Sequence, residues 1–174
     1  MSRRHLALPR VWMLTDERQG EAPERIAARL PRHVGVVVRH YSLPLRERIV
    51  LARRIAGTGR FTVFAGTEGE ARRAKAQGVY GASPERAGLP RLYPVHDAAE
   101  IAAAERAGAA MLLLSPAFPT RSHPDTRALG AVRFGLLARQ ASRPVIALGG
   151  VNRTRARRLR GLGAEGWAAI DAFG

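Results

Sequence analysis

The loop after the apolar run Met111–Leu114 carries side chains that could bind an anion or transfer a proton. Its second half holds Thr120, Ser122 and His123. Hydroxyl groups can donate to phosphate oxygens, although they also stabilise turns, and the imidazole of histidine ionises near neutral pH. The loop is therefore a candidate for phosphate binding or acid–base chemistry. For His123, a solvated loop histidine is the equal alternative.

Two further apolar runs stop at residues that suit a ligand site. Residues 144–148 stop at Gly149 and Gly150, and residues 166–170 stop at Asp171. Glycines let backbone N–H groups approach a phosphate closely. A carboxylate at Asp171 would repel a phosphate if both were poorly solvated. The glycines therefore predict a backbone site for an anion. Asp171 stays a candidate for substrate binding, but its carboxylate does not suit a phosphate.

Arg39 follows another apolar run, and its neighbour in sequence is His40. Alternation along a strand turns one of these two side chains inward. Because a buried arginine without an anionic partner is costly, we expect Arg39 to face a ligand. A purely structural ion pair with Asp16 is the alternative.

His96 lies at the junction between an expected strand and an expected helix, which places it at the mouth of a site. A structural bond to Asp97 or to the backbone is as good an interpretation as a catalytic role. Asp97 is the expected N-cap of the helix, and Glu100 lies at the position of a capping box.

These residues must be positioned by elements that alternate along the whole chain. Apolar and β-branched runs predict strands, and segments with helical spacing predict helices. Gly78, Gly108 and Gly163 follow three of the helices, where a left-handed glycine would end each one. The expected strands are 11–16, 34–39, 61–65, 79–81, 91–96, 111–114, 144–148 and 166–170, and the expected helices are 21–30, 44–56, 68–77, 97–107, 130–141 and 154–162.

Eight strands with intervening helices predict a compact (β/α)8 TIM barrel formed by residues 1–174 as a single domain. The segment 83–89 is too short for more than a vestigial helix after the fourth strand, and no helix follows the eighth. An open, doubly wound sheet is the alternative. In a barrel, the loops at the carboxyl ends of the strands meet around one ligand site.

The net charge of +15 is extreme, and Lys75 is the only lysine among the 29 basic residues. Such a charge suits a polyanion or a phosphorylated substrate. However, arginines occur in every expected helix, and no basic stretch is interleaved with aromatics. We therefore favour solvated helix surfaces and a phosphorylated small-molecule ligand, and we expect no nucleic-acid partner.

The chain has no cysteine, which excludes disulfides and thiolate metal sites. No run approaches the ~20 apolar residues of a membrane span, and the basic first residues do not form a signal peptide. We expect a cytoplasmic protein without a membrane partner.

Several segments resemble the thiamine-phosphate synthase family, including its thiazole tautomerase (TenI-like) branch. Residues 116–123 are similar to the family's Gly-Pro-Val-Phe-x-Thr-x-Thr-Lys loop, which is the most specific match. The remaining resemblances are Val11–Asp16 to the first strand, Gly78–Tyr80 to a Gly-Val-His strand, Val95–Glu100 to a Ser-x-His segment, and Pro144–Gly150 to Pro-Val-Val-Ala-Ile-Gly-Gly. The resemblance implies a transferase of thiamine biosynthesis that joins a pyrimidine pyrophosphate to a thiazole phosphate, with Mg²⁺, and releases pyrophosphate.

By this resemblance, Arg39, Ser122 and His123 would be catalytic, and Thr120, Gly149, Gly150, His96 and Asp171 would bind substrates. The chain departs from the family where the chemistry is most demanding. Val37 and Tyr41 replace a glutamine and a lysine of the pyrophosphate site, and Gly66 replaces the aspartate that holds the metal.

Three more positions differ from the family pattern. His123 stands for a lysine, Asp171 for a serine, and Pro116 for the histidine of the tautomerase branch. Glu85 is a loose substitute for a metal carboxylate, so we assign no metal ligand. Whether the chain is an active enzyme stays open. The alternative is a divergent TenI-like member without synthase activity, which binds a phosphorylated small molecule or a protein partner.

The missing last helix leaves an apolar flank near Trp167 and Phe173 with little cover. Apolar surface of this kind is usually covered by another subunit. We therefore expect a homo-oligomer.

Overall fold

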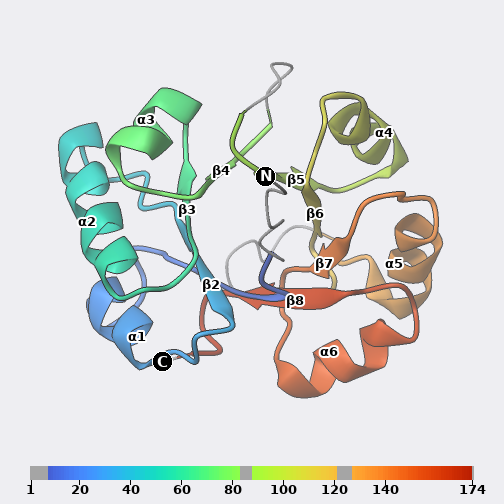
Figure 1. The fold of residues 1–174 in the computed structure, drawn as a ribbon. Helices are drawn as coiled ribbons and strands as arrows, with labels where there is room; N and C mark the ends of the chain where they lie inside the picture. Colours follow the sequence, from blue (N-terminus) through green and yellow to red (C-terminus); the bar gives the residue numbers. More distant parts are fainter. Residues whose placement is uncertain (1–7, 83–87, 121–126, 174) are drawn as a thin grey trace.

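A closed barrel of eight parallel strands forms the centre of the protein (Figure 1). The computed structural model describes residues 8–82, 88–120 and 127–173. Each strand pairs with the next in sequence, and β1 also pairs with β8, so that Val11 lies opposite Trp167. This pairing confirms the TIM barrel and shows that the open-sheet alternative is wrong. The strands are β1 (Val11–Leu14), β2 (Val34–Val38), β3 (Thr62–Ala65), β4 (Gly78–Tyr80), β5 (Arg91–Val95), β6 (Met111–Leu114), β7 (Val145–Ala147) and β8 (Gly166–Ala169).

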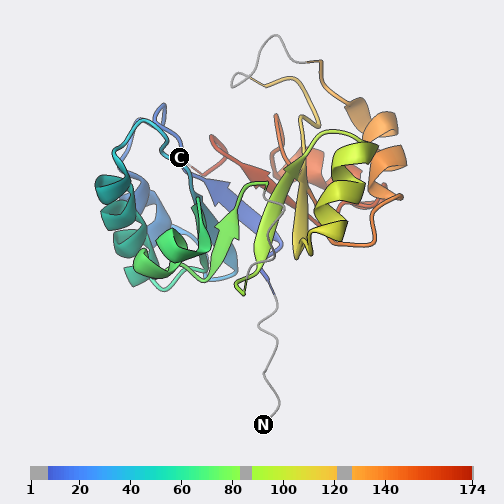
Figure 2. The same ribbon diagram turned by 90° about the horizontal axis from the view of Figure 1, so that it is seen from above.

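Helices surround the barrel on its outer side (Figures 1 and 2). Because the strands are parallel and mostly buried on both faces, they are apolar along nearly their whole length, with Thr62 and Arg91 as exceptions at the starts of β3 and β5. The expected vestigial helix falls largely on residues 83–87, which lie outside the described residues. Residues 171–173 form no helix. The helices in the described ranges are α1 (Pro23–Arg29), α2 (Leu45–Gly57), α3 (Glu68–Arg73), α4 (Ala98–Arg106), α5 (Gly130–Ala138) and α6 (Arg153–Arg160).

Alternate residues of each strand point into the barrel and out to the helices. Trp12 and Leu14 of β1 join the inner cluster, whereas Met13 packs outward against Ile26 of α1. The Trp12 ring is fully buried and lies against Gly35 of β2, where a Cβ would collide with it. The inner core therefore requires glycine at position 35.

One of the three helix ends at which a glycine was expected differs from the pattern. Gly108 and Gly163 have positive φ values of 82° and 105°, as expected for left-handed residues after a helix. The expectation for Gly78 was wrong, because this residue already belongs to β4. Helix α3 ends at Arg73 rather than Gln77, and Lys75 adopts the left-handed conformation with φ 55°. The connection to β4 is therefore made by Lys75 and not by a glycine.

The capping box expected at α4 was also wrong in part. The Asp97 side chain accepts the Glu100 N–H at 2.9 Å, as expected of an N-cap. The Glu100 carboxylate instead accepts from His96. A complete capping box does form at α3, between Thr67 and Glu70.

The carboxyl ends of all strands meet on one side of the barrel, which Figure 2 shows in side view. The loops that follow the strands therefore gather segments that are distant in sequence. Among the described helices, none has the length and apolar character needed to cross a membrane.

Candidate active site at the carboxyl ends of the strands

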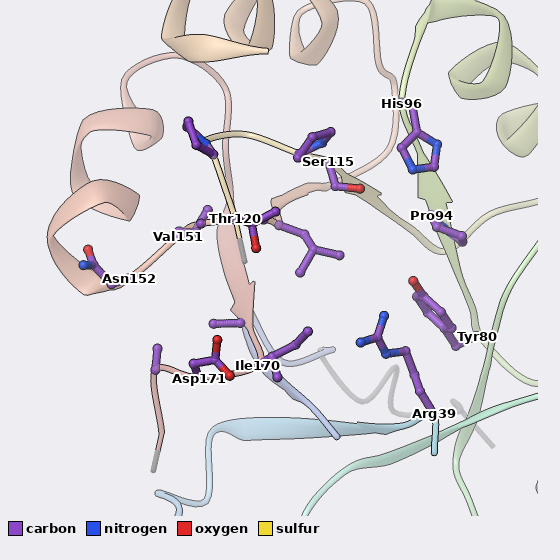
Figure 3. Close-up of a pocket in the computed structure, with 17 residues that line it drawn as sticks. Arg39, Tyr80, Pro94, His96, Ser115, Thr120, Val151, Asn152, Ile170 and Asp171 are labelled. Atoms are coloured by element: carbon purple, nitrogen blue, oxygen red, sulfur yellow. The ribbon is translucent and has the colours of Figure 1, made fainter. Parts of the chain in front are cut away.

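A cavity of about 800 Å³ opens among the loops at the carboxyl ends of the strands (Figure 3). Its wall comes from segments at the ends of β2, β4, β5, β6, β7 and β8. This is where ligands bind in barrels of this kind. Ser122 and His123 lie outside the described residues. Six residues expected from the sequence line the cavity together: Arg39, His96, Thr120, Gly149, Gly150 and Asp171.

Arg39 is held from two sides at the end of β2. Its backbone N–H donates to Thr15 Oγ1 at 3.0 Å, and its guanidinium donates to the Asp16 carboxylate at 3.1 Å. The side chain is 19% exposed. The two interpretations of Arg39 are therefore compatible, because the ion pair with Asp16 positions a guanidinium that also lines the cavity.

Asp16 is the anchor of this arrangement. Its carboxylate accepts from Nε of Arg18 at 2.6 Å and from a second guanidinium nitrogen of Arg18 at 2.8 Å. These hydrogen bonds from Arg18 are the largest cause that lowers the pKa of Asp16 from 3.8 to about 2, and the charge of Arg39 adds to the effect. The carboxylate is thus ionised throughout the physiological range and neutralises part of the positive charge beside the cavity.

Tyr80 was not predicted as a site residue, although it lines the cavity at the end of β4. Figure 3 shows its hydroxyl turned toward the Arg39 guanidinium. Burial raises the pKa of Tyr80, and the nearby charge of Arg39 opposes that rise. The phenol therefore stays protonated and can donate a hydrogen bond to a ligand. Its position at the carboxyl end of a short buried strand was the signal that could have identified it.

His96 lies on the opposite side of the cavity from Asp171 (Figure 3). Its Nδ1 lies 2.8 Å from Oε2 of Glu100, and its backbone N–H donates to the same oxygen at 2.7 Å. The partner of the ring is therefore Glu100 and not Asp97, which was one of the alternatives considered. An Nδ1–H that donates to the carboxylate leaves Nε2 as the acceptor nitrogen, the arrangement that orients many functional histidines.

Gly149 and Gly150 follow β7 with positive φ values of 88° and 59°. The loop after β6 packs directly on them, because the Phe118 N–H donates to the Gly149 carbonyl at 3.0 Å. A Cβ on Gly149 would lie 2.8 Å from Cα of Pro116, and a Cβ on Gly150 would collide with the Pro119 carbonyl. Both the backbone conformation and the close approach of this loop therefore require glycine.

Helix α6 begins immediately after these glycines. Asn152 lines the cavity and caps the helix by accepting the Arg155 N–H at 2.9 Å. The Arg155 guanidinium donates to the Gly150 carbonyl at 2.6 Å and stacks over the Phe118 ring at 5.2 Å. Arg153, at the start of the helix, is not among the residues that line the cavity. The arginine that supports this wall is therefore Arg155.

Asp171 follows β8 and is exposed at the rim of the cavity. Arg18 carries a raised pKa, chiefly because it bonds to Asp16 and in smaller part because Asp171 is near. Arg18 therefore compensates part of the negative charge that Asp171 brings to the mouth.

The described residues form no cluster that would hold Mg²⁺ by protein side chains alone. At the position of the expected metal aspartate, a Cβ on Gly66 would collide with the Glu70 carboxylate. Glu70 is already used in the capping box, where it accepts the Thr67 N–H at 2.8 Å. Across residues 8–82, 88–120 and 127–173, no group of three or more histidine, cysteine or acidic side chains could hold a metal ion. Glu85, the other candidate, lies outside the described residues.

Comparison with known proteins agrees with this architecture. Residues 93–173 match the family model described as thiamine monophosphate synthase. Over 81 residues, the chain is 33% identical to the thiamine-phosphate synthase of Pyrococcus furiosus. The carboxyl-terminal part of the chain is therefore similar to the thiamine monophosphate synthase family. The alignment covers 47% of this chain and 38% of that relative, so the chain matches well under half the length of the relative.

Solved structures extend the likeness to the whole barrel at the level of fold. A thiamine phosphate pyrophosphorylase from Pyrococcus furiosus superposes with a TM-score of 0.76 at 22% identity, covering 95% of this chain and 86% of that chain. FabK from Thermotoga maritima superposes with a TM-score of 0.74 at 14% identity, covering 95% of this chain and 59% of that chain. At these identities the superpositions show the shared barrel alone.

The family match divides the cavity into two halves. His96, Thr120, Gly149, Gly150 and Asp171 lie within the matched residues 93–173. Arg39, Asp16 and Tyr80 lie in the unmatched half, which also contains the departures at Val37, Tyr41 and Gly66. The segment that the family model matches therefore contributes the glycine wall, and the unmatched segment contributes the charged wall.

Proposed function

We propose that this chain is a thiamine-phosphate synthase-like transferase, which couples a pyrimidine pyrophosphate to a thiazole phosphate. The observation that carries the proposal is the single cavity in which Arg39 faces the same space as Thr120 and the pair Gly149–Gly150. The family match over residues 93–173 and the name of the Pyrococcus furiosus relative support the same reaction class.

In this proposal Arg39 holds the pyrophosphate. A guanidinium binds phosphate oxygens through charge-assisted and often bidentate hydrogen bonds. Because Asp16 and Thr15 hold Arg39 before any ligand arrives, its donors need little reorganisation. Preorganised donors stabilise the negative charge that grows on a leaving group. The Tyr80 hydroxyl would donate to the same leaving group.

The opposite wall would bind the thiazole phosphate and the rings of the two substrates. The backbone at Gly149 and Gly150 would cradle the phosphate, with a hydroxyl from Thr120. His96 and Asp171 would hold polar groups of the substrates at the two sides of the mouth. Ser122 and His123, which lie outside the described residues, would complete the pyrophosphate site as the family resemblance implies.

No step of this proposal passes through a metal, because the described residues form no cluster that would hold Mg²⁺ by protein side chains alone. Magnesium in the reaction would be carried by the pyrophosphate itself. The assay below measures how turnover depends on the Mg²⁺ concentration. We also propose a cytoplasmic location, which suits a biosynthetic transferase, and a homo-oligomeric state.

Purified protein incubated with both substrates tests the proposal by release of pyrophosphate and appearance of the coupled product, across a series of Mg²⁺ concentrations. Turnover is expected, and Arg39→Ala should lower kcat by about 100-fold, as for loss of one preorganised donor. Arg46→Ala is the matched control, because Arg46 is an exposed arginine of α2 that does not line the cavity.

Absence of turnover at every Mg²⁺ concentration would overturn the synthase proposal. If calorimetry then showed that the thiazole phosphate still binds the wild-type protein, the divergent non-synthase alternative would replace it.

A further inference from the structure

The arginines of the chain are divided unevenly between its two halves. From Arg127 to Ala164 the sequence has nine arginines and no aspartate or glutamate. This segment contains α5 and α6, which lie next to each other on the outside of the barrel (Figure 1). The acidic residues that could balance these charges lie elsewhere in the chain.

Ion pairs are found only outside this segment, although several arginines elsewhere, such as Arg46 and Arg53 of α2, also form no ion pair within the described residues. Four surface arginines in the rest of the protein each meet a glutamate, and we call these the paired arginines. Within the described ranges, no arginine of α5 or α6 forms an ion pair with a carboxylate. The four pairs are Arg10–Glu165, Arg29–Glu21, Arg54–Glu24 and Arg72–Glu68.

Helix α6 concentrates the unpaired charge. Leu159 anchors the helix in the core and Ala156 is half-buried, while every other side chain of the helix is exposed. Arg155 is engaged with Gly150 and Phe118 and is set aside. The four remaining arginines, which we call the basic face, are Arg153, Arg157, Arg158 and Arg160.

The basic face destabilises the helix that carries it. Arg153 and Arg157 are four residues apart and Arg157 and Arg160 are three apart, so like charges are neighbours on the helix surface. Arg153 also places a cation at the amino-terminal end, where the helix dipole favours an anion, and the first turn has no acidic residue. Arg157, Arg158 and Arg160 lie in the last turn, where the dipole favours cations. The cost therefore comes from the like-charge neighbours and from Arg153, and an external polyanion would relieve it.

We propose that the basic face binds the phosphate backbone of a nucleic acid without sequence preference. Guanidinium groups match phosphate oxygens bidentately, and phosphate contacts supply most of non-specific nucleic-acid affinity. The sequence argued against such a partner because arginines occur in every helix, but in the described part of the chain α6 carries more exposed arginines without an ion pair than any other helix. This inference does not depend on the proposed enzymatic function.

An anionic membrane fits α6 less well than a nucleic acid does. Helices that lie in a membrane interface bury an apolar face in the lipid. The apolar residue Leu159 of α6 is already buried in the protein core. On α5, Val132 and Leu136 are 78% and 57% exposed, so a lipid surface is included in the test as the competing outcome.

The experiment measures fluorescence anisotropy of a labelled single-stranded RNA of mixed sequence over a series of salt concentrations. Wild-type binding should weaken steeply with salt. A variant with all four basic-face arginines changed to glutamine should bind at least about tenfold more weakly at low salt. Its slope of log affinity against log salt should be shallower by about 3, since each neutralised single-strand phosphate contributes ~0.7.

The control variant changes the four paired arginines to glutamine and removes the same total charge. Its affinity and slope should remain close to wild type, and circular dichroism and thermal melting verify that both variants fold. Equal losses of RNA affinity in the two variants would show that net charge alone governs binding, and this result would overturn the proposal. Absence of RNA binding at low salt would also overturn it, as would cosedimentation with phosphatidylglycerol vesicles in place of RNA binding.

Discussion

The guanidinium of Arg39 lies 3.1 Å from the carboxylate of Asp16, which ties the end of β2 to the end of β1. The same carboxylate accepts two hydrogen bonds from the Arg18 guanidinium. A single buried aspartate thus orders two cations at the mouth of the cavity. The consequences can be measured both in stability and in ligand binding.

Acid should weaken the fold through Asp16. Its pKa is lowered from 3.8 to about 2, so the ion pairs contribute their full stabilisation above 3.8 and lose it as the pH falls toward 2. We expect Asp16→Asn to remove about 1–2 kcal/mol of this pH-dependent stability. Urea unfolding of both proteins between pH 5 and pH 2 measures it. Parallel pH profiles for the two proteins would contradict the prediction.

Gly35→Ala should destabilise the barrel, because the new methyl group would collide with the buried ring of Trp12. Overpacking of this kind costs about 1–3 kcal/mol. Gly57→Ala is the control, since Gly57 lies in α2 with no atom near its missing Cβ. That change should leave stability unchanged or raise it by up to about 1 kcal/mol. If chemical unfolding showed that Gly57→Ala is less stable than Gly35→Ala, the contact with Trp12 would not determine the requirement for glycine at position 35.

Gly150→Ala should disturb the wall of the cavity. The substitution combines a positive φ of 59° with a collision against the loop after β6. Gly130→Ala is matched to it, because Gly130 has φ 69° but open space around its missing Cβ. We expect Gly150→Ala to lose about 1–3 kcal/mol more stability than Gly130→Ala. We also expect it alone to weaken binding of the thiazole phosphate measured by calorimetry.

If the two variants lost equal stability and bound the thiazole phosphate alike, backbone conformation alone would explain the requirement for glycine at position 150. The packing of Pro119 on Gly150 would then have no part in shaping the site.

The assembly state is a separate prediction. Trp167 and Phe173 stack with ring centroids 5.2 Å apart, and both remain half-buried. Phe173 thus covers part of the flank that the sequence left open. We still expect a dimer or larger species at micromolar concentration, because this flank and the exposed Val132 and Leu136 of α5 leave apolar surface in water. Sedimentation velocity measures it, and a single monomeric species would contradict the prediction.

The positions of the site residues along the chain could be predicted because they depend on local pattern. Arg39, His96, Gly149 and Asp171 each follow a buried strand, and parallel strands bring such residues to one side of the barrel. The closed barrel could be expected from eight strand signals. The interpretation of Gly78 failed because a helix end depends on backbone geometry, and Lys75 supplied the left-handed residue instead.

The sequence by itself determined which residues lie at the carboxyl ends of the strands, since periodicity, apolar runs and glycines act over a few neighbouring residues. Only the tertiary structure decided their partners. Asp16 and Arg39 are 23 residues apart, and they meet because the barrel places the end of β1 beside the end of β2. Tyr80 reaches the cavity because β4 is held in the closed ring between β3 and β5. Such contacts depend on strand register around the barrel, which no single segment of the chain contains.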